Sequence, residues 1–224
     1  MARRKIDKQE AAQPLSRERI VQAALDEVAE SGLPALSMRK VGQRLGREAM
    51  SLYHHFPSKQ HLLDAMVDHA IGSIPAPPAA LAPMARLRHA IDGYRAMANR
   101  FPALFALIAV HRLNTPVGVR YIESILALIR AVVPDDELAA RHFRVIGYYI
   151  VGAGLDESAG YAEGPSAAEP VDGAFIAREC PQLVRAAPYF QRPHWDATFA
   201  LGVDALLAAL QRDAARLRRA ARAG

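Results

Sequence analysis

The stretch over 36–59, LSMRKVGQRLGREAMSLYHHFPSK, constrains the fold of this chain more than any other. Ser37 is a typical helix N-cap, because its hydroxyl can accept from free backbone N–H groups of the first turn. Gly46 follows the last periodic apolar position and can turn the chain at positive φ. The pattern predicts two short helices, over 37–45 and 47–55, joined by a tight turn. This geometry places the second helix in the major groove of DNA.

The outer face of the second helix carries groups that can reach bases and phosphates. Its inner face is formed by Ala49, Leu52 and Phe56, at helical spacing. The residues outside that face are Arg47, Glu48, Met50, Ser51, His54 and the hydroxyl of Tyr53, with His55 and Lys59 at the end. Any helical hairpin can place a glycine between two short helices, and the Tyr53 ring could equally be core packing. The motif therefore needs support from its flanks.

The charge distribution gives part of that support. Residues 1–60 hold 11 Lys/Arg against 7 Asp/Glu, whereas residues 61–210 hold 12 against 15. A basic N-terminal unit on a mildly acidic body suits contact with a polyanion, with Arg3, Arg4 and Lys5 as a candidate mobile arm. The alternative is that basic tails are merely solvated, and this is our interpretation of the basic C-terminal end.

Caps, glycines and prolines predict helices along the whole chain. A helix from the cap Ser16 to Ser31 precedes the motif, another runs from Ser58 to Ser73, and the proline-rich run over 75–82 is a predicted linker. Further helices are expected over 84–99, 102–111, 115–133, 135–161, 174–179, 181–187 and 194–219, with a loop over 162–173. The branched residues over 145–155 could suit a strand, but no turn residue follows until Gly160, so we expect helix there.

The expected fold class is all-α, with an N-terminal three-helix helix-turn-helix domain and a C-terminal helical ligand-binding and dimerisation domain. The predicted parts are a flexible basic arm (1–14), a DNA-binding domain (15–74), the linker (75–82), an effector-binding and dimerisation domain (83–219) and a tail (220–224). Apolar residues make up 51% of the chain, but no run is long enough to cross a bilayer, and no secretory signal is present. We expect a cytoplasmic protein without a membrane partner.

Small residues on two helices predict a dimer interface, because they let partner helices approach closely. They are Gly147, Val151, Gly154 and Ser158 on one helix and Gly202, Ala205 and Ala209 on the last. The alternative is that these residues only let helices pack within one subunit. A symmetric dimer also suits a short helix-turn-helix, which reads two half-sites about one DNA turn apart.

The N-terminal part resembles the TetR family of bacterial transcriptional regulators over roughly residues 15–70. The matching features are the capped first helix ending at Gly32, Leu36-Ser37, Leu45-Gly46, Leu52-Tyr53-His54-His55-Phe56 and Lys59. The LLDAM after Lys59 and the VHRLNTP over 110–116 further resemble the tetracycline-repressor branch.

The resemblance implies roles for individual residues of the motif. Ser37, Tyr53, His55 and Lys59 match family positions that hold phosphates. Arg39, Ala49, Met50 and Ser51 match positions that read bases. Simple chemistry agrees, since arginine can bond guanine in a bidentate manner, and methionine or alanine can meet a thymine methyl.

The resemblance also implies that the helical body binds a small-molecule effector and that the helix over 58–73 transmits the change. The expected pocket wall is Met97, Phe101, Phe105, His111, Ile125, Ile129 and Tyr149, each of which could also be simple core. His111 matches a histidine that helps hold the magnesium of the drug in tetracycline repressors. Pro75, Gly93 and Asn114 stand where the other polar contacts of that site would be. We therefore expect an unidentified, more apolar effector.

Metal and enzyme readings find little support in the sequence. The eight histidines form no His-x3-His or Glu-x2-His set, and the single Cys180 cannot build a cysteine cluster. No phosphate-binding glycine loop, nucleophile elbow or catalytic carboxylate pair is recognisable. We expect no metal, cofactor or enzymatic activity.

The sequence predicts a homodimeric regulator, most simply a repressor, that binds a palindromic duplex DNA operator and is released by a small molecule. The alternative is an all-α small-molecule carrier whose helix-turn-helix no longer binds DNA.

Overall fold

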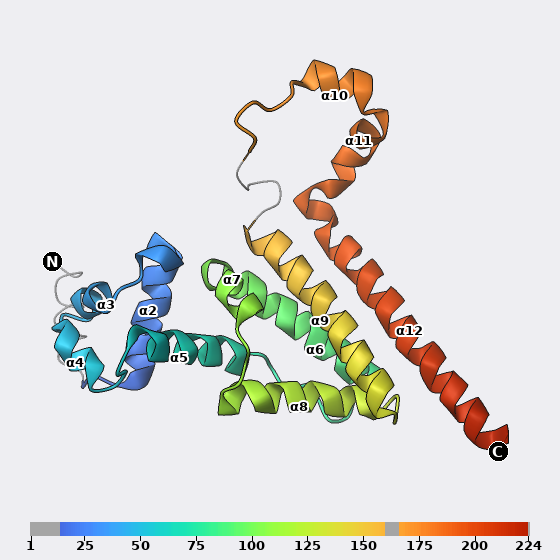
Figure 1. Cartoon of the computed structure of the whole chain (residues 1–224), viewed down its shortest axis with the longest axis horizontal. Helices are drawn as coiled ribbons and strands as arrows, with labels where there is room; N and C mark the ends of the chain where they lie inside the picture. Colours follow the sequence, from blue (N-terminus) through green and yellow to red (C-terminus); the bar gives the residue numbers. More distant parts are fainter. Residues whose placement is uncertain (1–13, 160–165, 224) are drawn as a thin grey trace.

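The computed structural model describes residues 14–159 and 166–223, and that part of the chain is helical with no strand (Figure 1). This confirms the all-α prediction. The helices in chain order are α2 (Arg17–Ser31), the 3-10 turn η1 (Leu33–Ala35), α3 (Met38–Arg44), α4 (Ala49–Tyr53), α5 (Lys59–Gly72), α6 (Pro83–Arg100), α7 (Pro102–Val110), α8 (Pro116–Arg130), α9 (Asp136–Ala159), α10 (Gly173–Glu179), α11 (Pro181–Ala186), the 3-10 turns η2 (Ala187–Phe190) and η3 (Arg192–His194), and α12 (Trp195–Ala223). The predicted arm residues Arg3, Arg4 and Lys5 lie outside the described residues.

Side chains cap two helices at the residues that the sequence predicted. The Ser16 hydroxyl accepts a hydrogen bond from the Arg19 backbone N–H at 3.3 Å. Thr115 does the same for Gly118 at 3.1 Å. Each cap satisfies one of the free N–H groups of the first turn. Gly32, at φ 77°, ends α2 as predicted.

The second helix of the helix-turn-helix is shorter than predicted. The Arg47 N–H bonds back to the Gly42 carbonyl at 2.9 Å, and Glu48 is extended, so α4 begins only at Ala49. It ends at Tyr53, before His54. The prediction of a helix over 47–55 was therefore wrong at both ends.

Other boundaries also differ from the predicted ones. Helix α8 ends at Arg130 rather than 133, because the chain turns there and the Val133 N–H bonds the Ile129 carbonyl at 2.9 Å. Helix α12 runs to Ala223, so most of the predicted tail is helical. The predicted end of α9 at Tyr161 lies outside the described residues.

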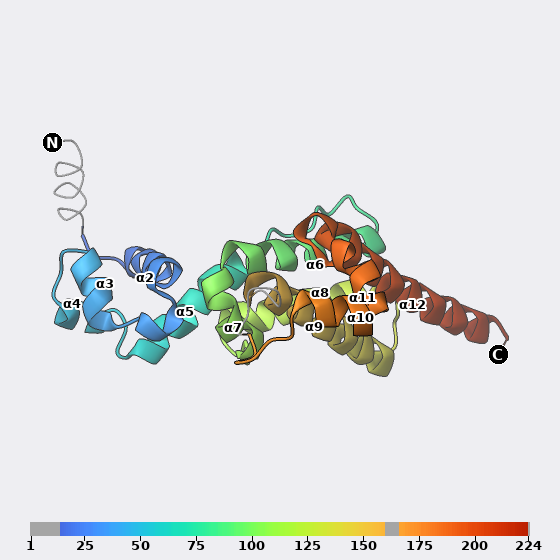
Figure 2. The ribbon, with the colours of Figure 1, turned by 90° about the horizontal axis from the view of Figure 1, so that it is seen from above.

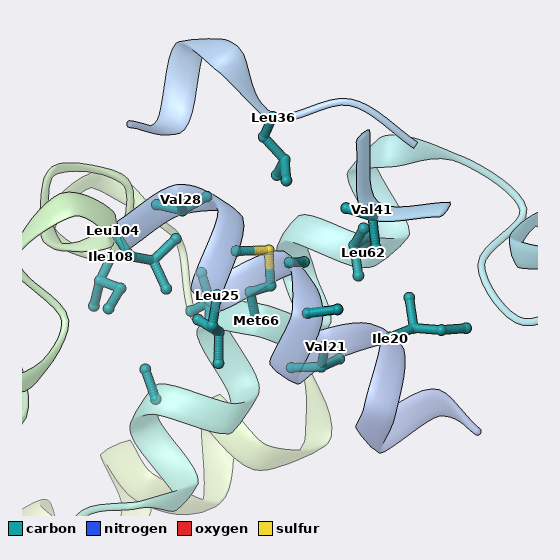
Figure 3. Packing of buried hydrophobic residues seen from close by; sticks show 14 of the residues in the cluster. Ile20, Val21, Leu25, Val28, Leu36, Val41, Leu62, Met66, Leu104 and Ile108 are labelled. Atoms are coloured by element: carbon teal, nitrogen blue, oxygen red, sulfur yellow. The ribbon is translucent and has the colours of Figure 1, made fainter. Parts of the chain in front are cut away.

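Two apolar clusters hold the structure together. The first joins α2–α5 to α7 and the end of α6, and the second joins α6, α8, α9 and α12. Figure 3 shows Leu104 and Ile108 of α7 beside Val28 of α2. The DNA-binding domain predicted over 15–74 thus shares its core with the body, although the proline-rich run after it forms no regular element.

The helix-turn-helix and the end of α12 lie far apart. Both views place α3 and α4 at one end of the molecule and the end of α12 at the other (Figures 1 and 2). Figure 1 also shows α10 and α11 projecting from the body. Within the described ranges, no helix has the length and apolar character that a membrane span requires.

Candidate DNA-binding surface and ligand cavity

A tight turn orients α4 relative to α3. Gly46 adopts a φ of 63°, the left-handed conformation predicted for it. Gly42 is buried, and a Cβ there would lie 2.8 Å from the Arg47 carbonyl oxygen. Only glycine therefore fits at position 42. The sequence reading missed this requirement, because the contact is made five residues further along the chain.

Charged side chains fasten α3 to α2. The buried Glu27 carboxylate accepts from Lys40 and from Arg44, each at 3.1 Å, and Arg44 also pairs with Glu30. Hydrogen bonds from Lys40 and then Arg44 lower the pKa of Glu27 below its ordinary value. This network fixes the angle of the helix that supports the turn. Its members are 13 and 17 residues apart, so no local spacing revealed it.

The far end of α4 is also held by α2. Arg17 donates to the His55 carbonyl, and its guanidinium lies 4.1 Å from the centroid of the buried Phe56 ring. The short α4 is therefore supported at both ends.

The ten predicted DNA-binding residues lie on α3, α4, their flanks and the start of α5. Six are exposed, namely Arg39, Arg47, Met50, Tyr53, His54 and Lys59, and four are half-buried, namely Ser37, Ala49, Ser51 and His55. Met50 is 68% exposed and Tyr53 is 40% exposed, so the Tyr53 ring is not core packing.

The half-buried serines already have local partners. Ser37 accepts from the Lys40 N–H at 3.3 Å and caps α3, and Ser51 donates to the Glu48 carbonyl at 2.7 Å. Ala49 packs against the first apolar cluster. These three residues shape the surface, whereas the exposed residues can contact DNA directly.

A cavity of about 530 Å³ lies in the body. Its lining comes from α6, α7, the α7–α8 connection, α8 and α9: Tyr94, Ile108, Ala109, His111, Arg112, Leu113, Tyr121, Ile122, Ile125, Phe143, Arg144, Ile146, Gly147, Tyr148, Ile150, Val151, Gly152 and Leu155. The volume falls in the usual range for small-molecule sites.

The predicted effector wall agrees with this cavity in part. His111 and Ile125 line it, whereas Met97, Phe101, Phe105, Ile129 and Tyr149 do not. Phe105, Ile129 and Met97 are buried in the apolar clusters. Phe101 lies edge-on to His69, and the Tyr149 hydroxyl donates to the Phe199 carbonyl at 3.0 Å. The prediction from the resemblance left open whether these five residues were core or pocket wall, and the structure does not place them in the cavity lining.

The connection between α7 and α8 joins the cavity to α5. His111 Nδ1 accepts from the Leu113 N–H at 3.0 Å, so the neutral ring carries its proton on Nε2, which lies 3.2 Å from an Asp64 carboxylate oxygen. One turn further along α5, Asp68 accepts from the Thr115 hydroxyl. Leu113 has a φ of 51°, a strained conformation for a bulky residue.

The predicted dimer-interface residues have mixed surroundings. Cβ atoms at Gly154 and Gly202 would collide with the rings of Phe105 and Tyr149 of the same chain. Those two glycines serve packing within the subunit, which corrects their assignment to a dimer face. Gly147 and Val151 line the cavity, Ser158 and Ala209 are half-buried, and Ala205 is exposed.

Metal-binding clusters are absent from the part of the chain that the structure describes. Cys180 is a half-buried free thiol. Two tyrosines of the cavity, the buried Tyr94 and the half-buried Tyr121, have a raised pKa. Burial raises the pKa of Tyr94 to about 12 and also raises the pKa of Tyr121. Both hydroxyls therefore stay protonated at neutral pH.

The structure combines a helix-turn-helix that exposes polar groups and a helical body that contains a cavity. This combination is typical of one class of protein, the helix-turn-helix regulatory proteins. Two family models match this chain. Residues 20–66 match "Bacterial regulatory proteins, tetR family", and residues 78–213 match "Tetracyclin repressor-like, C-terminal domain". The chain belongs to the TetR family.

Relatives and solved structures support this assignment. The HTH-type transcriptional repressor DrrR1 of Streptomyces coeruleorubidus is 35% identical over 148 residues, which cover 62% of this chain and 52% of the relative, about half its length. The class A tetracycline repressor from Escherichia coli is 28% identical over 200 residues, covering 82% of this chain and 85% of the relative. The structure of ActR from Streptomyces coelicolor in complex with (S)-DNPA has a TM-score of 0.71 and 26% identity, covering 90% of this chain and 100% of that one.

Proposed function

We propose that this chain is a ligand-responsive transcriptional repressor that acts in the cytoplasm, binds a palindromic operator as a homodimer and is released by a small molecule. The proposal rests on two hydrogen bonds that hold α5. Asp64 bonds His111, which lines the cavity, and Asp68 bonds Thr115, which follows it in the chain. A ligand in the cavity can act on these contacts and so on the position of the DNA-binding surface. The repressor DrrR1 and the ligand complex of ActR favour the same reading.

Release by a ligand requires different affinities in two states. A molecule that binds the cavity better when α5 is displaced shifts the protein toward that state, and DNA then disfavours the ligand by the same factor. The strained Leu113 lies between His111 and Thr115, in the segment that would rearrange. This segment is therefore the proposed switch.

The dimer interface is proposed on α9 and α12, as in the prediction, but on other residues. Val145 and Tyr148 of α9 and Leu201 of α12 are large apolar side chains with exposures of 45%, 64% and 73%. Such residues are typical of an uncovered interface. Leu201→Glu should weaken dimerisation about a hundredfold or more, measured by sedimentation, because a central charge would be buried unpaired. The matched control is Arg212→Glu, an exposed position further along α12.

Selection of bound duplexes from a random DNA pool tests the function directly. We expect a palindromic site whose half-sites lie about one helical turn, roughly 34–36 Å, apart. A single half-site would contradict the dimer. Enrichment of no sequence, with binding lost uniformly as salt rises, would favour the carrier alternative.

A further inference from the structure

The lining of the cavity points to the chemistry of its ligand. We propose that it takes a flat aromatic acid, whose anionic group lies near Arg112 and Arg144 and whose oxygen acceptors meet the hydroxyls of Tyr94 and Tyr121. This inference rests on the proposed function in one respect, because the same cavity is the effector site there. It narrows the apolar effector expected from the sequence to a molecule with one charged end.

The walls favour a flat, apolar framework. The rings of Tyr94 and Tyr121 are nearly parallel, with an angle of 24° between their planes and 6.3 Å between centroids. Phe143 and several branched aliphatic side chains complete the wall. Aromatic faces and aliphatic side chains offer a large contact area with few hydrogen bonds, which suits a planar ring system.

The charges of the lining favour an anion. No carboxylate lines the cavity, and its charged side chains are Arg112 and Arg144. Within residues 14–159 and 166–223, neither arginine forms an ion pair with a carboxylate. Asp64, which bonds His111, is not part of the lining. A negatively charged ligand group would therefore meet positive charge without a competing carboxylate.

Arg144 is also held in place beside the cavity. Its guanidinium donates to the Tyr148 hydroxyl at 2.8 Å and lies 4.7 Å from the centroid of that ring. Tyr148 itself lines the cavity. An arginine that is restrained by a neutral partner keeps its charge and its remaining N–H donors for a ligand, and arginine bonds carboxylates in a bidentate manner.

The inner hydroxyls supply the second contact. Neither the Tyr94 nor the Tyr121 hydroxyl has a hydrogen-bond partner among the described residues, although Tyr94 is buried and Tyr121 half-buried. Neither hydroxyl is among the enclosed polar atoms that lack a partner, so both are open to the cavity, and each can donate to an acceptor oxygen on a ligand. Because burial raises the pKa of each hydroxyl, each remains a donor at neutral pH.

Three probes with one ring system test the charge preference. They are anthraquinone-2-carboxylic acid, its uncharged carboxamide and the cationic 2-(aminomethyl)anthraquinone, and binding to the full-length protein is measured by equilibrium dialysis. We expect the acid to bind about tenfold more tightly than the carboxamide, since charge-assisted bonds are the stronger ones, and the amine to bind most weakly.

Variants assign that preference to residues. The double variant Arg112→Gln/Arg144→Gln should bring the affinity for the acid down to that for the carboxamide. Arg141→Gln is the matched control, because Arg141 is an exposed arginine of α9 that lies outside the lining. Tyr94→Phe and Tyr121→Phe should each weaken the anthraquinone acid a few-fold and leave anthracene-2-carboxylic acid, which lacks the quinone oxygens, unchanged.

Several results would overturn the inference: equal binding of acid and carboxamide, an equal loss in Arg141→Gln, or no binding of any probe at roughly 1 mM. The duplex selection is read separately. A protein that selects a palindrome but ignores the acid keeps the proposed function and loses this ligand class. A protein that binds the acid but selects no duplex keeps the ligand class and loses the repressor.

Discussion

The two ends of the molecule are packed in opposite ways. At the DNA-binding end, Leu52, Phe56 and Leu62 are completely buried, and the polar groups that can contact DNA point outward from a closed core. In the body, the core opens into a cavity of about 530 Å³ whose lining includes Tyr94 and Tyr121 together with the exposed Arg112 and Arg144. The first arrangement keeps a surface rigid, whereas the second leaves room for a ligand and for rearrangement.

Helix α5 belongs to both arrangements. Leu62 and Met66 lie in the apolar cluster with α2 (Figure 3). Asp64 and Asp68 bond the connection that follows α7. Because close-packed side chains transmit displacement, we expect a shift of α5 in the body to move the helices that carry the proposed DNA-binding residues. The tightly packed core at one end would therefore pass on a movement that a ligand causes in the open core at the other end.

The largest expected effect is on the free energy of unfolding, and it compares how tightly the two cores are packed. Phe56→Ala should destabilise the protein by about 3–5 kcal/mol, because it leaves a hole in a closed core. Ile122→Ala should cost only about 1–2 kcal/mol, since Ile122 is half-buried and faces an existing cavity. Urea unfolding followed by circular dichroism measures both. Equal losses would show that the cavity wall is packed as tightly as the DNA-binding end.

The second prediction divides the outward surface into base and phosphate contacts. Arg39→Ala should weaken operator binding by about 1–3 kcal/mol and relax specificity at one base position. Lys59→Ala should weaken all duplexes similarly and lower the salt dependence by about one ion. Titrations of the selected operator and of point-mutated operators at several salt concentrations distinguish the two.

The matched control for both is Arg120→Ala, an exposed arginine of α8 in the body. If it weakened binding as much as Arg39→Ala, the loss would reflect overall charge rather than the assigned surface. If neither Arg39→Ala nor Lys59→Ala changed binding, the assignment of the DNA-binding surface would be wrong.

The third prediction concerns the link between the two ends. Asp64→Asn should leave operator affinity nearly unchanged without ligand and reduce the ligand-dependent change in that affinity by about 0.5–2 kcal/mol. The readout is operator affinity with and without anthraquinone-2-carboxylic acid. Gln60 also donates to Asp64, at 2.7 Å, so Gln60→Ala tests whether that local bond matters. An undiminished ligand effect in Asp64→Asn would remove this contact from the switch.

The sequence predicted the DNA-binding end better than the body because the signals there are local. A cap and a positive-φ glycine each act within a few residues, so Ser37 and Gly46 could be read directly. The length of α4 depended on the bond between Arg47 and the Gly42 carbonyl, which no periodicity encodes.

The cavity could not be derived from periodicity, because an inward residue can face either another side chain or empty space. Phe105 and Ile125 share the same apolar pattern, yet Phe105 is packed against Tyr94 and Ile125 lines the cavity. Gly154 and Gly202 gave the same difficulty, since close approach within a subunit and between subunits requires the same small residue. These distinctions are set by contacts between distant segments.

The smallest expected effect tests whether the buried carboxylate of Glu27 contributes stability through its charge, whereas an exposed ion pair of the body does not. Hydrogen bonds from Lys40 and Arg44 lower the pKa of Glu27 in the folded protein, so folding favours the ionised carboxylate. This contribution is complete above the ordinary pKa of 4.5 and is lost as the pH falls through the lower folded value. Glu27→Gln should therefore lower the unfolding midpoint modestly at pH 7, and the difference from the unchanged protein should shrink below pH 4.5.

Glu137→Gln, which removes an exposed pair with Arg141 in the body, should change the midpoint little at either pH. A loss for Glu27→Gln that stayed constant from pH 7 to acid would assign the role of Glu27 to its shape rather than its charge.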